Sequence, residues 1–394
     1  KQDELDFHFR VSNVSAVIAD ERGAELCRGV FDGWEEPVRV IAPADLERLA
    51  GTEPRRLEPR GPDEPLVYLF SSGSTGRPKR VPRTQGQVCA EAAFYPDVGI
   101  GPEDRIFVTV PLFHSYGMGF CLLAAAGTGA ALILLEEPNP FLLRRGTAME
   151  LIERERATVM PGVPFHYRLM AEASDEADLS SLRLCFSAGT ALPRPVFDAF
   201  TSRFCVPVRQ HYGCTEAGSL TANLDADPGP TAGTAGTPIG PVEIRIVDGE
   251  VAVRSPAMTS GYSDMDELNR EAFRDGFFLT GDLGELDEEG RLTITGRKKL
   301  LIEVGGYKVD PIEVEDVVIA HPKVAEAVVV GVEGKVQGEE LVKAVVVPGD
   351  ELEERELIGF CQQRLANFKV PQVVEFREEI PKSPLGKILR KYLI

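Results

Sequence analysis

Residues 71–81, with the sequence SSGSTGRPKRV, combine hydroxyl, glycine and cationic side chains directly after an apolar run that is typical of a strand. Glycines in this stretch allow backbone N–H groups to turn toward a bound anion, and phosphate suits the nearby hydroxyls and lysine. The pattern is not a Walker A loop, because Lys79 follows a proline and precedes an arginine. A solvated turn is the competing interpretation. The candidate phosphate-binding residues are Ser71, Ser72, Gly73, Ser74, Thr75 and Lys79.

Four further segments carry residues that suit phosphate and carboxylate chemistry. They are PLFHSYGM (111–118), HYGCTEAG (211–218), FLTGDLGELDEEGRLTITGRKK (278–299) and PKSPLGKILRKYL (381–393). With the phosphate loop, and in this order, they resemble the core motifs of the adenylate-forming (AMP-binding) superfamily, which includes acyl- and aryl-CoA ligases, peptide-synthetase adenylation domains and luciferases. The resemblance extends from about residue 66 to the C-terminus.

This resemblance implies that the protein activates a carboxylate. Such enzymes join a carboxylate to the α-phosphate of ATP, release pyrophosphate and pass the acyl group of the acyl-AMP to a thiol. Because negative charge spreads over the phosphate oxygens, catalysis depends on positioning and charge neutralisation. By resemblance, the loop from Ser71 to Lys79 holds the β- and γ-phosphates of ATP. Thr215 lies near the α-phosphate, and Glu216 binds Mg²⁺, which commonly takes one carboxylate plus phosphate oxygens.

The same resemblance assigns the adenosine site. Tyr212 and the turn Gly189-Thr190 pack against adenine, and Asp282 accepts hydrogen bonds from both ribose hydroxyls. Arg297 adds a contact with ribose or phosphate. The alternatives are a half-buried core tyrosine, an aspartate that only forms a turn, and an interdomain ion pair for the arginine.

The C-terminal motif implies a mobile small domain. In this family, the lysine that matches Lys387 enters the active site and bridges the carboxylate and the α-phosphate during adenylation. The small domain then rotates for thioester formation, with Lys299 at the hinge. Gly305, Gly306 and Tyr307 lie along the tunnel that admits the thiol.

The segment FHSYGM resembles the acyl- and aryl-CoA ligase branch. Amino-acid-activating members carry an aspartate here to pair with the substrate ammonium, and residues 113–116 contain no acid, which disfavours α-amino acids. Gly117 and Gly119 are expected to leave room for an acyl chain or a flat ring. His114 is both a catalytic candidate and a pocket candidate, with a packing histidine as the alternative. The candidate pocket residues are His114, Tyr116, Gly117, Met118, Val163, Phe165, Ala188 and Gly213.

Composition restricts the partners. The 394 residues carry a net charge of −19, which argues against nucleic acid or an anionic membrane surface as a partner. No apolar run approaches the ~20 residues that span a bilayer. The seven cysteines are scattered without a C-x-x-C pair, so a zinc site or a disulfide framework is not expected, and a reducing cytoplasm is the simplest location.

The elements that must position these motifs indicate an α/β fold. Strand-like runs at 105–110, 130–135, 157–160, 182–188 and 206–211 alternate with helical patterns at 141–156 and 193–204, which predicts βαβ units and mostly parallel sheets. A small β-rich part follows, with a hairpin around Asp248-Gly249. We expect a large adenylation core over residues 1–297 and a small, mobile α+β C-terminal domain over residues 298–394, with helices at 311–322 and 353–368.

Two departures from the family pattern matter. Only about seventy residues precede the phosphate loop, and residues 12–23 resemble the middle of the usual N-terminal subdomain, so the N-terminal region is expected to be shortened, by natural reduction or by truncation. Some coumarate-ligase and luciferase relatives have a lysine where Glu303 stands, and that lysine serves their second half-reaction. This difference weakens the analogy with aryl ligases without excluding thioester formation.

Three functions follow from these patterns. The first is an AMP-forming ligase that uses ATP and Mg²⁺ to make a thioester of a fatty or aromatic acid with CoA. The second is the same adenylation with transfer to the phosphopantetheine of a carrier protein. The third is a non-catalytic nucleotide-binding relative, which the joint presence of Lys79, Glu216, Asp282, Arg297 and Lys387 disfavours. A homodimer is left open as the state of assembly.

Overall fold

The computed structural model of the chain describes residues 2–53, 58, 60–71, 79–135, 141–304, 307–334, 340–382 and 388–394. Internal contacts divide the chain into two units, residues 1–61 and residues 62–394. Within the described residues, no helix is long and apolar enough to cross a lipid bilayer.

Residues 1–61 contain a small βαβ unit. Its elements are α1 (Gln2–Ser12), β1 (Ala16–Ile18), α2 (Glu21–Phe31), β2 (Arg39–Ile41) and α3 (Pro43–Ala50). Strands β1 and β2 pair in parallel, as expected for strands joined by a helix. Helix α2 begins at Asp20, whose side chain accepts a hydrogen bond from the Gly23 amide, and it buries Ala24, Cys27 and Val30 along one face.

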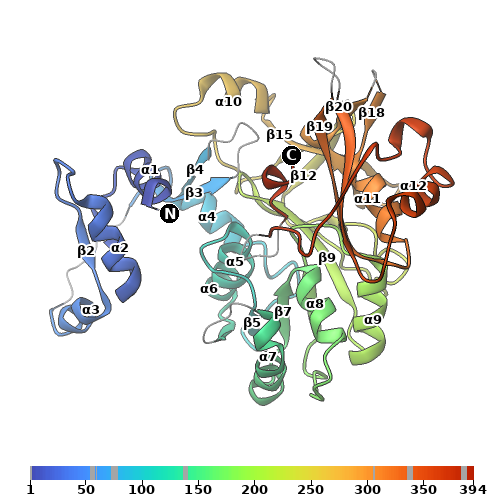
Figure 1. Cartoon of the computed structure of the whole chain (residues 1–394). Coiled ribbons are helices and arrows are strands. Elements are labelled where there is room, and N and C mark those ends of the chain that lie inside the picture. The colour runs from blue at the N-terminus through green and yellow to red at the C-terminus, as the bar shows by residue number, and fades with distance from the viewer. Residues whose placement is uncertain are drawn as a thin grey trace. The chain divides into compact units, whose positions relative to one another are not determined.

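An antiparallel hairpin precedes the main sheet of residues 62–394. Strand β3 (Pro65–Ser71) pairs with β4 (Lys79–Thr84), and their last pair joins Ser71 to Lys79. Thr84 caps the following helix, α4 (Gln85–Ala92), because its hydroxyl accepts a hydrogen bond from the Gln87 amide. The hairpin and α4 lie side by side in Figure 1.

A seven-stranded sheet occupies the centre of residues 62–394, in the order β11-β10-β9-β8-β7-β5-β6. Its strands are β5 (Arg105–Val108), β6 (Ala131–Leu134), β7 (Val159–Gly162), β8 (Leu184–Ser187), β9 (Val208–Cys214), β10 (Gly218–Ala222) and β11 (Thr237–Pro238). Strands β5 to β9 run in parallel, whereas β10 and β11 are antiparallel to their neighbours. The strands and the largely parallel sheet predicted from the alternating pattern are therefore confirmed.

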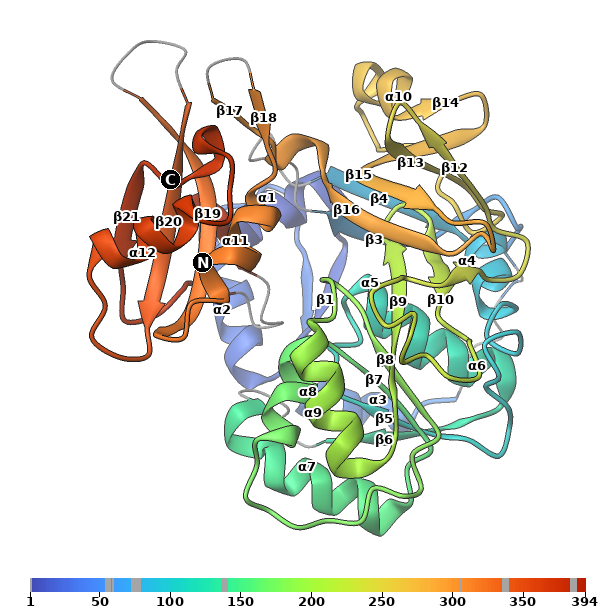
Figure 2. The same ribbon diagram turned by 90° about the vertical axis from the view of Figure 1, so that its right-hand side faces the viewer.

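Both faces of this sheet are covered, which explains its continuous apolar runs. Ile106 and Phe186 belong to one core cluster, whereas their neighbours Phe107 and Cys185 belong to the other, because successive side chains in a strand point to opposite faces. Helices α7 (Phe141–Glu155), α8 (Pro164–Ala171) and α9 (Arg194–Phe204) cover the second face, where Figure 2 shows them together. The opposite face carries α4, a π-helical segment over Met118–Leu123, and α6 (Ala124–Thr128).

The predicted β-rich part forms a second, antiparallel sheet. It contains β12 (Glu243–Val247), β13 (Glu250–Arg254), β14 (Phe273–Arg274), β15 (Phe277–Leu286) and β16 (Leu292–Arg297), and α10 (Asp266–Ala272) precedes β14. The hairpin predicted around Asp248-Gly249 joins β12 to β13, and both turn residues have positive φ, as a two-residue type I′ turn requires.

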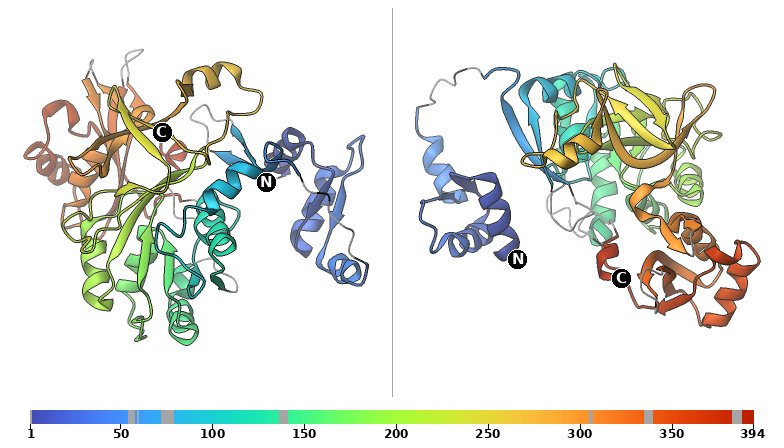
Figure 3. Two further views of the ribbon diagram at one scale, coloured as in Figure 1. Left: turned by 180° about the vertical axis from the view of Figure 1, so that it is seen from behind. Right: turned by 90° about the horizontal axis from the view of Figure 1, so that it is seen from above.

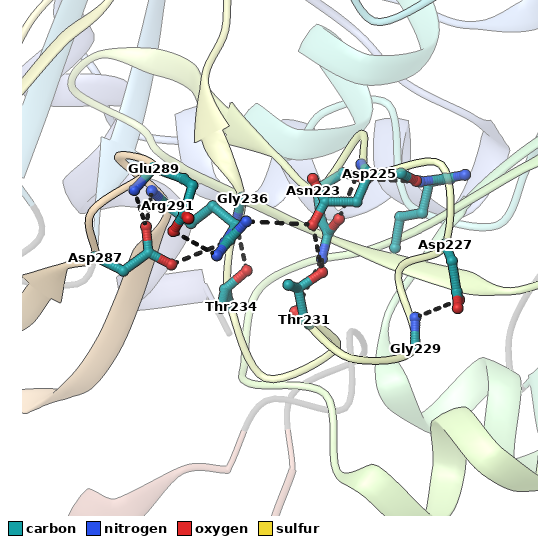
Figure 4. Close-up of polar contacts among 11 residues, drawn as sticks. Asn223, Asp225, Asp227, Gly229, Thr231, Thr234, Gly236, Asp287, Glu289 and Arg291 are labelled. Carbon is teal, nitrogen blue, oxygen red and sulfur yellow. Dashed lines mark hydrogen bonds and ion pairs between the residues drawn. The ribbon is translucent and has the colours of Figure 1, made fainter.

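A polar cluster ties the turn between β15 and β16 to the loop that follows β10 (Figure 4). Arg291 donates to Asp287 (2.8 Å) and Glu289 (2.9 Å) within its own turn, and its guanidinium lies 3.9 Å from Asp225. Asp225 in turn accepts a hydrogen bond from Thr231 (2.6 Å). These contacts hold the two sheets together, and with them the motif residues carried by β9 and β15.

The C-terminal part is a separate α+β arrangement, drawn in orange and red in Figure 3. Its elements are β17 (Ile302–Val304), β18 (Tyr307–Val309), α11 (Pro311–Ile319), β19 (Val324–Glu333), β20 (Glu340–Pro348), α12 (Glu354–Gln362) and β21 (Val373–Phe376). Strands β19, β20 and β21 form one sheet, and α11 and α12 pack on its own apolar core. The predicted α/β class with a small α+β part is confirmed.

One predicted helix is shorter than expected. The pattern over residues 353–368 predicts a continuous helix, but α12 ends at Gln362. The backbone becomes extended at Ala366, which allows Val370 to pack on the same core as Leu365. Tertiary packing therefore ends this helix earlier than the sequence pattern predicts.

Asp104 organises the edge of the sheet where the parallel strands begin. It is 1% exposed and accepts hydrogen bonds from the Gly101 amide (2.8 Å), the Thr158 hydroxyl (2.6 Å) and the Arg183 guanidinium (2.9 Å). Burial by itself raises the pKa of Asp104, but the hydrogen bonds outweigh this effect and leave that pKa below its usual value. One carboxylate thus joins the residues that precede β5, β7 and β8.

We expect Asp104→Asn to lower the free energy of unfolding at neutral pH by about 1–3 kcal/mol, because buried donors lose a charged acceptor. The pKa of this group is lowered in the folded chain, so its stabilisation is complete above the pKa of the unfolded chain and is lost as the pH falls through the folded pKa. Urea unfolding at a series of pH values should show the wild type and the variant converging in acid. A difference that stays constant into acid would contradict the assignment.

Candidate functional site

Four loops that follow parallel strands lie at one edge of the large sheet. They follow β5 at residues 109–114, β7 at Val163, β8 at residues 188–190, and β9 at residues 215–217. Because the carboxyl ends of neighbouring parallel strands meet at the same edge, these loops form a common surface, which is where α/β sheets bind ligands. Two of the five predicted motifs, at residues 111–118 and 211–218, contribute to it.

Glu216 lies between the phosphate-loop hairpin and the β-rich part. It is 8% exposed, and its Oε1 accepts hydrogen bonds from the Ser71 hydroxyl (3.1 Å) and the Tyr262 hydroxyl (2.9 Å). The Lys79 ammonium lies 4.6 Å from the centre of the Tyr262 ring, within the range of a cation–π contact. The structure therefore brings the two ends of the phosphate loop, Ser71 and Lys79, together with the predicted metal ligand.

Thr215, the neighbour of Glu216, contacts a second predicted motif. Its hydroxyl lies 3.2 Å from the hydroxyl of Ser115, the first residue of the short helix α5 (Ser115–Gly117). His114 caps this helix, because its Nδ1 accepts a hydrogen bond from the Tyr116 amide (3.2 Å). The exposed His114 therefore has a local structural role beside the predicted functional one.

The residues predicted to bind adenosine form a connected group. The Tyr212 hydroxyl donates to Asp282 Oδ2 (2.6 Å), and Arg297 Nε lies 3.1 Å from Asp282 Oδ1. Burial, followed by the negative charge of Asp282, raises the pKa of Tyr212 well above its usual range, so this phenol remains a hydrogen-bond donor at neutral pH. Asp282 and Arg297 are opposite each other in the β15–β16 pair, which explains their contact.

Buried Glu250 supports this group from the side. Its Oε1 accepts a hydrogen bond from the Gly281 amide (2.9 Å), directly before Asp282, and its Oε2 pairs with Lys298 (2.9 Å), directly after Arg297. Gly281 has φ of +79°, a conformation that favours glycine. Glu250 thus fixes the backbone before Asp282 and pairs with the side chain of the residue that follows Arg297.

Tyr116, a predicted pocket residue, packs against His211. Their rings stack at 5.5 Å with an angle of 16° between planes, and the Tyr116 hydroxyl donates to the Phe186 carbonyl (3.1 Å). His211 is 6% exposed, and burial lowers its pKa to about 3, so its ring is neutral. Neither ring nitrogen of His211 has a hydrogen-bond partner among the residues that the structure describes.

Close packing within the protein explains why glycine stands at positions 117 and 119. A Cβ on Gly117 would lie 2.1 Å from the Pro111 carbonyl oxygen, and a Cβ on Gly119 would lie 2.5 Å from a carboxylate oxygen of Glu91. The space on this side of each glycine is therefore filled by the protein itself. Room for an acyl chain beside them stays a prediction.

The remaining pocket candidates divide between the two cores. Tyr116, Met118 and Val163 pack with the first cluster, whereas Phe165 packs with the second, so the structure does not bring Phe165 into the same cluster. The other candidates lie at the edge described above: buried Ala188, exposed Gly189 and Thr190 after β8, and exposed Gly213 at the end of β9.

Several predicted residues lie outside the described part of the chain. They are Ser72, Gly73, Ser74, Thr75, Gly305, Gly306 and Lys387, together with the side chains of Lys299, Glu303 and Tyr307. Lys382 and Ile388, on either side of residues 383–387, pair in an antiparallel bridge. The Lys382 ammonium lies 5.9 Å from the Phe165 ring centre on α8, so the base of this segment contacts the large sheet's covering helices.

Sequence reasoning missed three residues of this site: Ser115, His211 and Tyr262. Ser115 and His211 lie inside motifs that were recognised, and a closer reading of each motif residue could have found them. Tyr262 lies in a loop with no comparable pattern, and only its contacts with Glu216 and Lys79 reveal it.

Comparison with known families identifies the class of protein that this fold and site define. The model of the AMP-binding enzyme family matches residues 1–263, and that of the AMP-binding enzyme C-terminal domain matches residues 313–387. The chain therefore belongs to the AMP-binding enzyme family, and the resemblance to adenylate-forming enzymes is confirmed.

Curated relatives are named as acid–CoA ligases. The chain is 33% identical to the 2-succinylbenzoate–CoA ligase of Bacillus cytotoxicus over 343 residues, which cover 84% of this chain and 70% of the relative. It is also 33% identical to the feruloyl-CoA synthase of an Amycolatopsis species over 406 residues, which cover 98% and 80%. These names agree with the predicted class, an AMP-forming acid–thiol ligase.

A solved structure supports the fold over the whole chain. ATP-bound MatB from Rhodopseudomonas palustris superposes with a TM-score of 0.88 at 26% identity, covering all of this chain and 81% of MatB. Among the curated relatives, the part that this chain spans ranges from 66% to 80% of their length.

Tyr212→Phe should weaken AMP binding by roughly tenfold, because Asp282, the predicted ribose ligand, loses a hydrogen bond that fixes its carboxylate. Isothermal titration with AMP measures the effect. Thermal unfolding serves as the control, since the variant retains the buried ring and should melt close to the wild type. Unchanged AMP affinity would show that the Tyr212 hydroxyl does not orient the nucleotide site.

Proposed function

We propose that this protein activates a carboxylic acid with ATP to form an acyl-adenylate and then transfers the acyl group to the thiol of CoA. The observation that carries the proposal is the meeting of Ser71, Lys79, Thr215 and Glu216, which come from distant parts of the sequence, at the carboxyl edge of the sheet. Packing of the fold does not require the end of a hairpin to contact a buried carboxylate at this edge of the sheet. Binding of a metal–phosphate group would explain the contact.

The Glu216 environment suits Mg²⁺. Among the described residues, no group of three or more His, Cys, Asp or Glu side chains is arranged to hold a metal ion, and Glu216 is the carboxylate proposed as its ligand. Mg²⁺ often binds one or two carboxylates together with substrate phosphates, and it would neutralise charge on the departing pyrophosphate. The hydrogen bonds from Ser71 and Tyr262 both reach Oε1 of Glu216, so its second carboxylate oxygen takes no part in them.

The second half-reaction requires a different arrangement of the C-terminal part. We infer that residues 298–394 move as a domain, with Lys299 at the hinge and Lys387 in the site during adenylation. The contact between Lys382 and Phe165 supports an arrangement in which the base of the Lys387 segment lies against the large domain. Gly305, Gly306 and Tyr307 would guide the thiol after rotation.

CoA is the proposed acceptor because the curated relatives are named as CoA ligases. A carrier-protein phosphopantetheine is the second candidate, since the same residues would line the thiol tunnel. The acid itself is left to experiment: the names of the relatives include aromatic acids, and the motif at residues 113–116 offers no partner for an ammonium. The reducing compartment and the homodimer stay predictions.

Pyrophosphate release tests the proposal directly. A panel of aromatic, fatty and dicarboxylic acids, each paired with its 2-amino analogue where one exists, is supplied with ATP and Mg²⁺. The acid without the amino group should be preferred by at least about tenfold, since an unpaired ammonium in the pocket costs more than ~1.4 kcal/mol. The preferred acid is then offered CoA and a carrier protein in competition. Preference for amino acids, or release with no acid at all, would refute the proposal.

Glu216→Gln should raise the Mg²⁺ concentration needed for half-maximal pyrophosphate release and lower the maximal rate by roughly 10²-fold. The amide keeps an oxygen for Ser71 and Tyr262 but removes the negative charge that a divalent cation requires. Tyr262→Phe is the matched control, because it removes one hydrogen bond and keeps the charge. Equal Mg²⁺ requirements in the wild type and Glu216→Gln would exclude Glu216 as the metal ligand.

Lys387→Ala should slow acyl-adenylate formation by roughly 10²–10³-fold, the usual cost of losing one charge-stabilising donor. It should leave the reaction of preformed acyl-adenylate with CoA unchanged, since the lysine acts only in the adenylating arrangement. Single-turnover assays of the two steps separate these effects. Equal loss in both steps would contradict a moving domain.

A further inference from the structure

A fully buried ion pair lies behind the phosphate-loop hairpin and was not anticipated from any motif. Arg83 on β4 and Glu91 on α4 are 0% and 1% exposed, and Arg83 Nη2 donates to Glu91 Oε2 (2.8 Å). Arg83 Nε and Nη1 have no hydrogen-bond partner within the described residues. Burying a guanidinium with two unused donors is costly, so stability alone gives little reason for the pair.

Glu91 connects this pair to β10. Its Oε1 accepts hydrogen bonds from the Ser219 amide (3.1 Å) and the Tyr95 hydroxyl (3.2 Å). The Tyr95 hydroxyl also lies 2.9 Å from the Ser219 hydroxyl. A carboxylate that accepts a backbone N–H together with an ion pair fixes the position of that backbone more firmly than apolar packing would.

The backbone around the Glu91 carboxylate is closely packed. A Cβ on Gly218 would lie 2.5 Å from Glu91 Oε2, and a Cβ on Gly119 would lie 2.5 Å from Glu91 Oε1. Gly218 also has φ of +72°, which favours glycine. Gly119 and Gly218, which lie on different elements, therefore lack the Cβ atoms that would collide with the Glu91 carboxylate.

The pair joins the two halves of the phosphate site. Arg83 belongs to the strand that begins at Lys79, and Ser219 follows the turn between β9 and β10 that carries Glu216. The network runs from Lys79 along β4 to the ion pair, and from there through the Ser219 amide to Glu216. On the opposite side, Ser71 contacts Glu216 directly.

We propose that the Arg83–Glu91 pair is a positioning device for the triphosphate: it sets the distance between the phosphate-loop hairpin and the Glu216 turn. This inference depends on the proposed nucleotide site and deepens it. A ligand with β- and γ-phosphates must contact both the hairpin and the turn through its metal ion, whereas AMP needs only the adenosine residues and Thr215. The pair should therefore matter for Mg–ATP and not for AMP.

The test uses the full chain and compares Mg–ATP with AMP by isothermal titration, which requires no knowledge of the acid. The variant is the double substitution Arg83→Met/Glu91→Met, since replacing both members of a buried pair with apolar residues of similar size is often tolerated. We expect Mg–ATP to bind at least about tenfold more weakly, equivalent to one lost hydrogen bond to a charged group, with AMP affinity unchanged. Pyrophosphate release should fall with Mg–ATP affinity.

Asp104→Asn is the matched control. Asp104 is also a buried carboxylate paired with an arginine, Arg183, but it lies at the opposite edge of the same sheet. It should lower stability and leave the ratio of Mg–ATP to AMP affinity at the wild-type value. A double variant in which both nucleotides weaken equally, or neither weakens, overturns the positioning role.

Arg83→Lys provides a second test if the double variant does not fold. The lysine keeps the charge and loses the fork geometry, so the ratio of Mg–ATP to AMP affinity should fall below the wild-type value, and an unchanged ratio overturns the positioning role. A wild type that binds both nucleotides but activates no acid would refute the proposed ligase function and still test the pair. A wild type that binds neither nucleotide would refute both.

Discussion

Buried carboxylates, and the need to give each of them hydrogen-bond donors, organise the large α/β part of this protein. A carboxylate removed from water is costly unless several donors surround it, so each buried one draws together groups from different elements. Asp104 gathers the beginnings of three parallel strands, Glu91 joins β4 and α4 to β10, and Glu216 joins the phosphate hairpin to the β-rich part. Glu250 does the same beside the Asp282–Arg297 pair.

The polar groups at the two edges of the central sheet have different roles. The edge where the parallel strands begin is closed by Asp104 with its arginine and threonine partners, and its chemistry is satisfied within the protein. The edge where the strands end carries Thr215 and Glu216, which contact Ser115 and the hairpin residue Ser71. The contacts at the first edge stabilise the fold, whereas the second edge is where the proposed phosphate site lies.

The glycines near the site show how sequence and packing can suggest different reasons for the same residue. From the motif alone, Gly117 and Gly119 suggested room for a substrate. In the structure, a Cβ on either residue would collide with the backbone of Pro111 or with Glu91. His211 shows the converse, because no pattern singled it out, yet its neutral ring stacks on Tyr116 and has no hydrogen-bond partner among the described residues.

The sequence by itself determined the class of fold, the strand order along the chain, the family and most motif residues, because alternating apolar runs and short phosphate-binding patterns are local properties. The motifs assigned Tyr212, Asp282 and Arg297 to one site, and the structure shows these residues in contact, while their role toward adenosine stays a prediction. Only the tertiary structure brought Ser71 to Glu216 and added Tyr262, and only it revealed the buried Arg83–Glu91 pair. Those contacts join residues that are far apart in the chain. They depend on the burial of charge and on the packing of glycines, and no local sequence pattern encodes either.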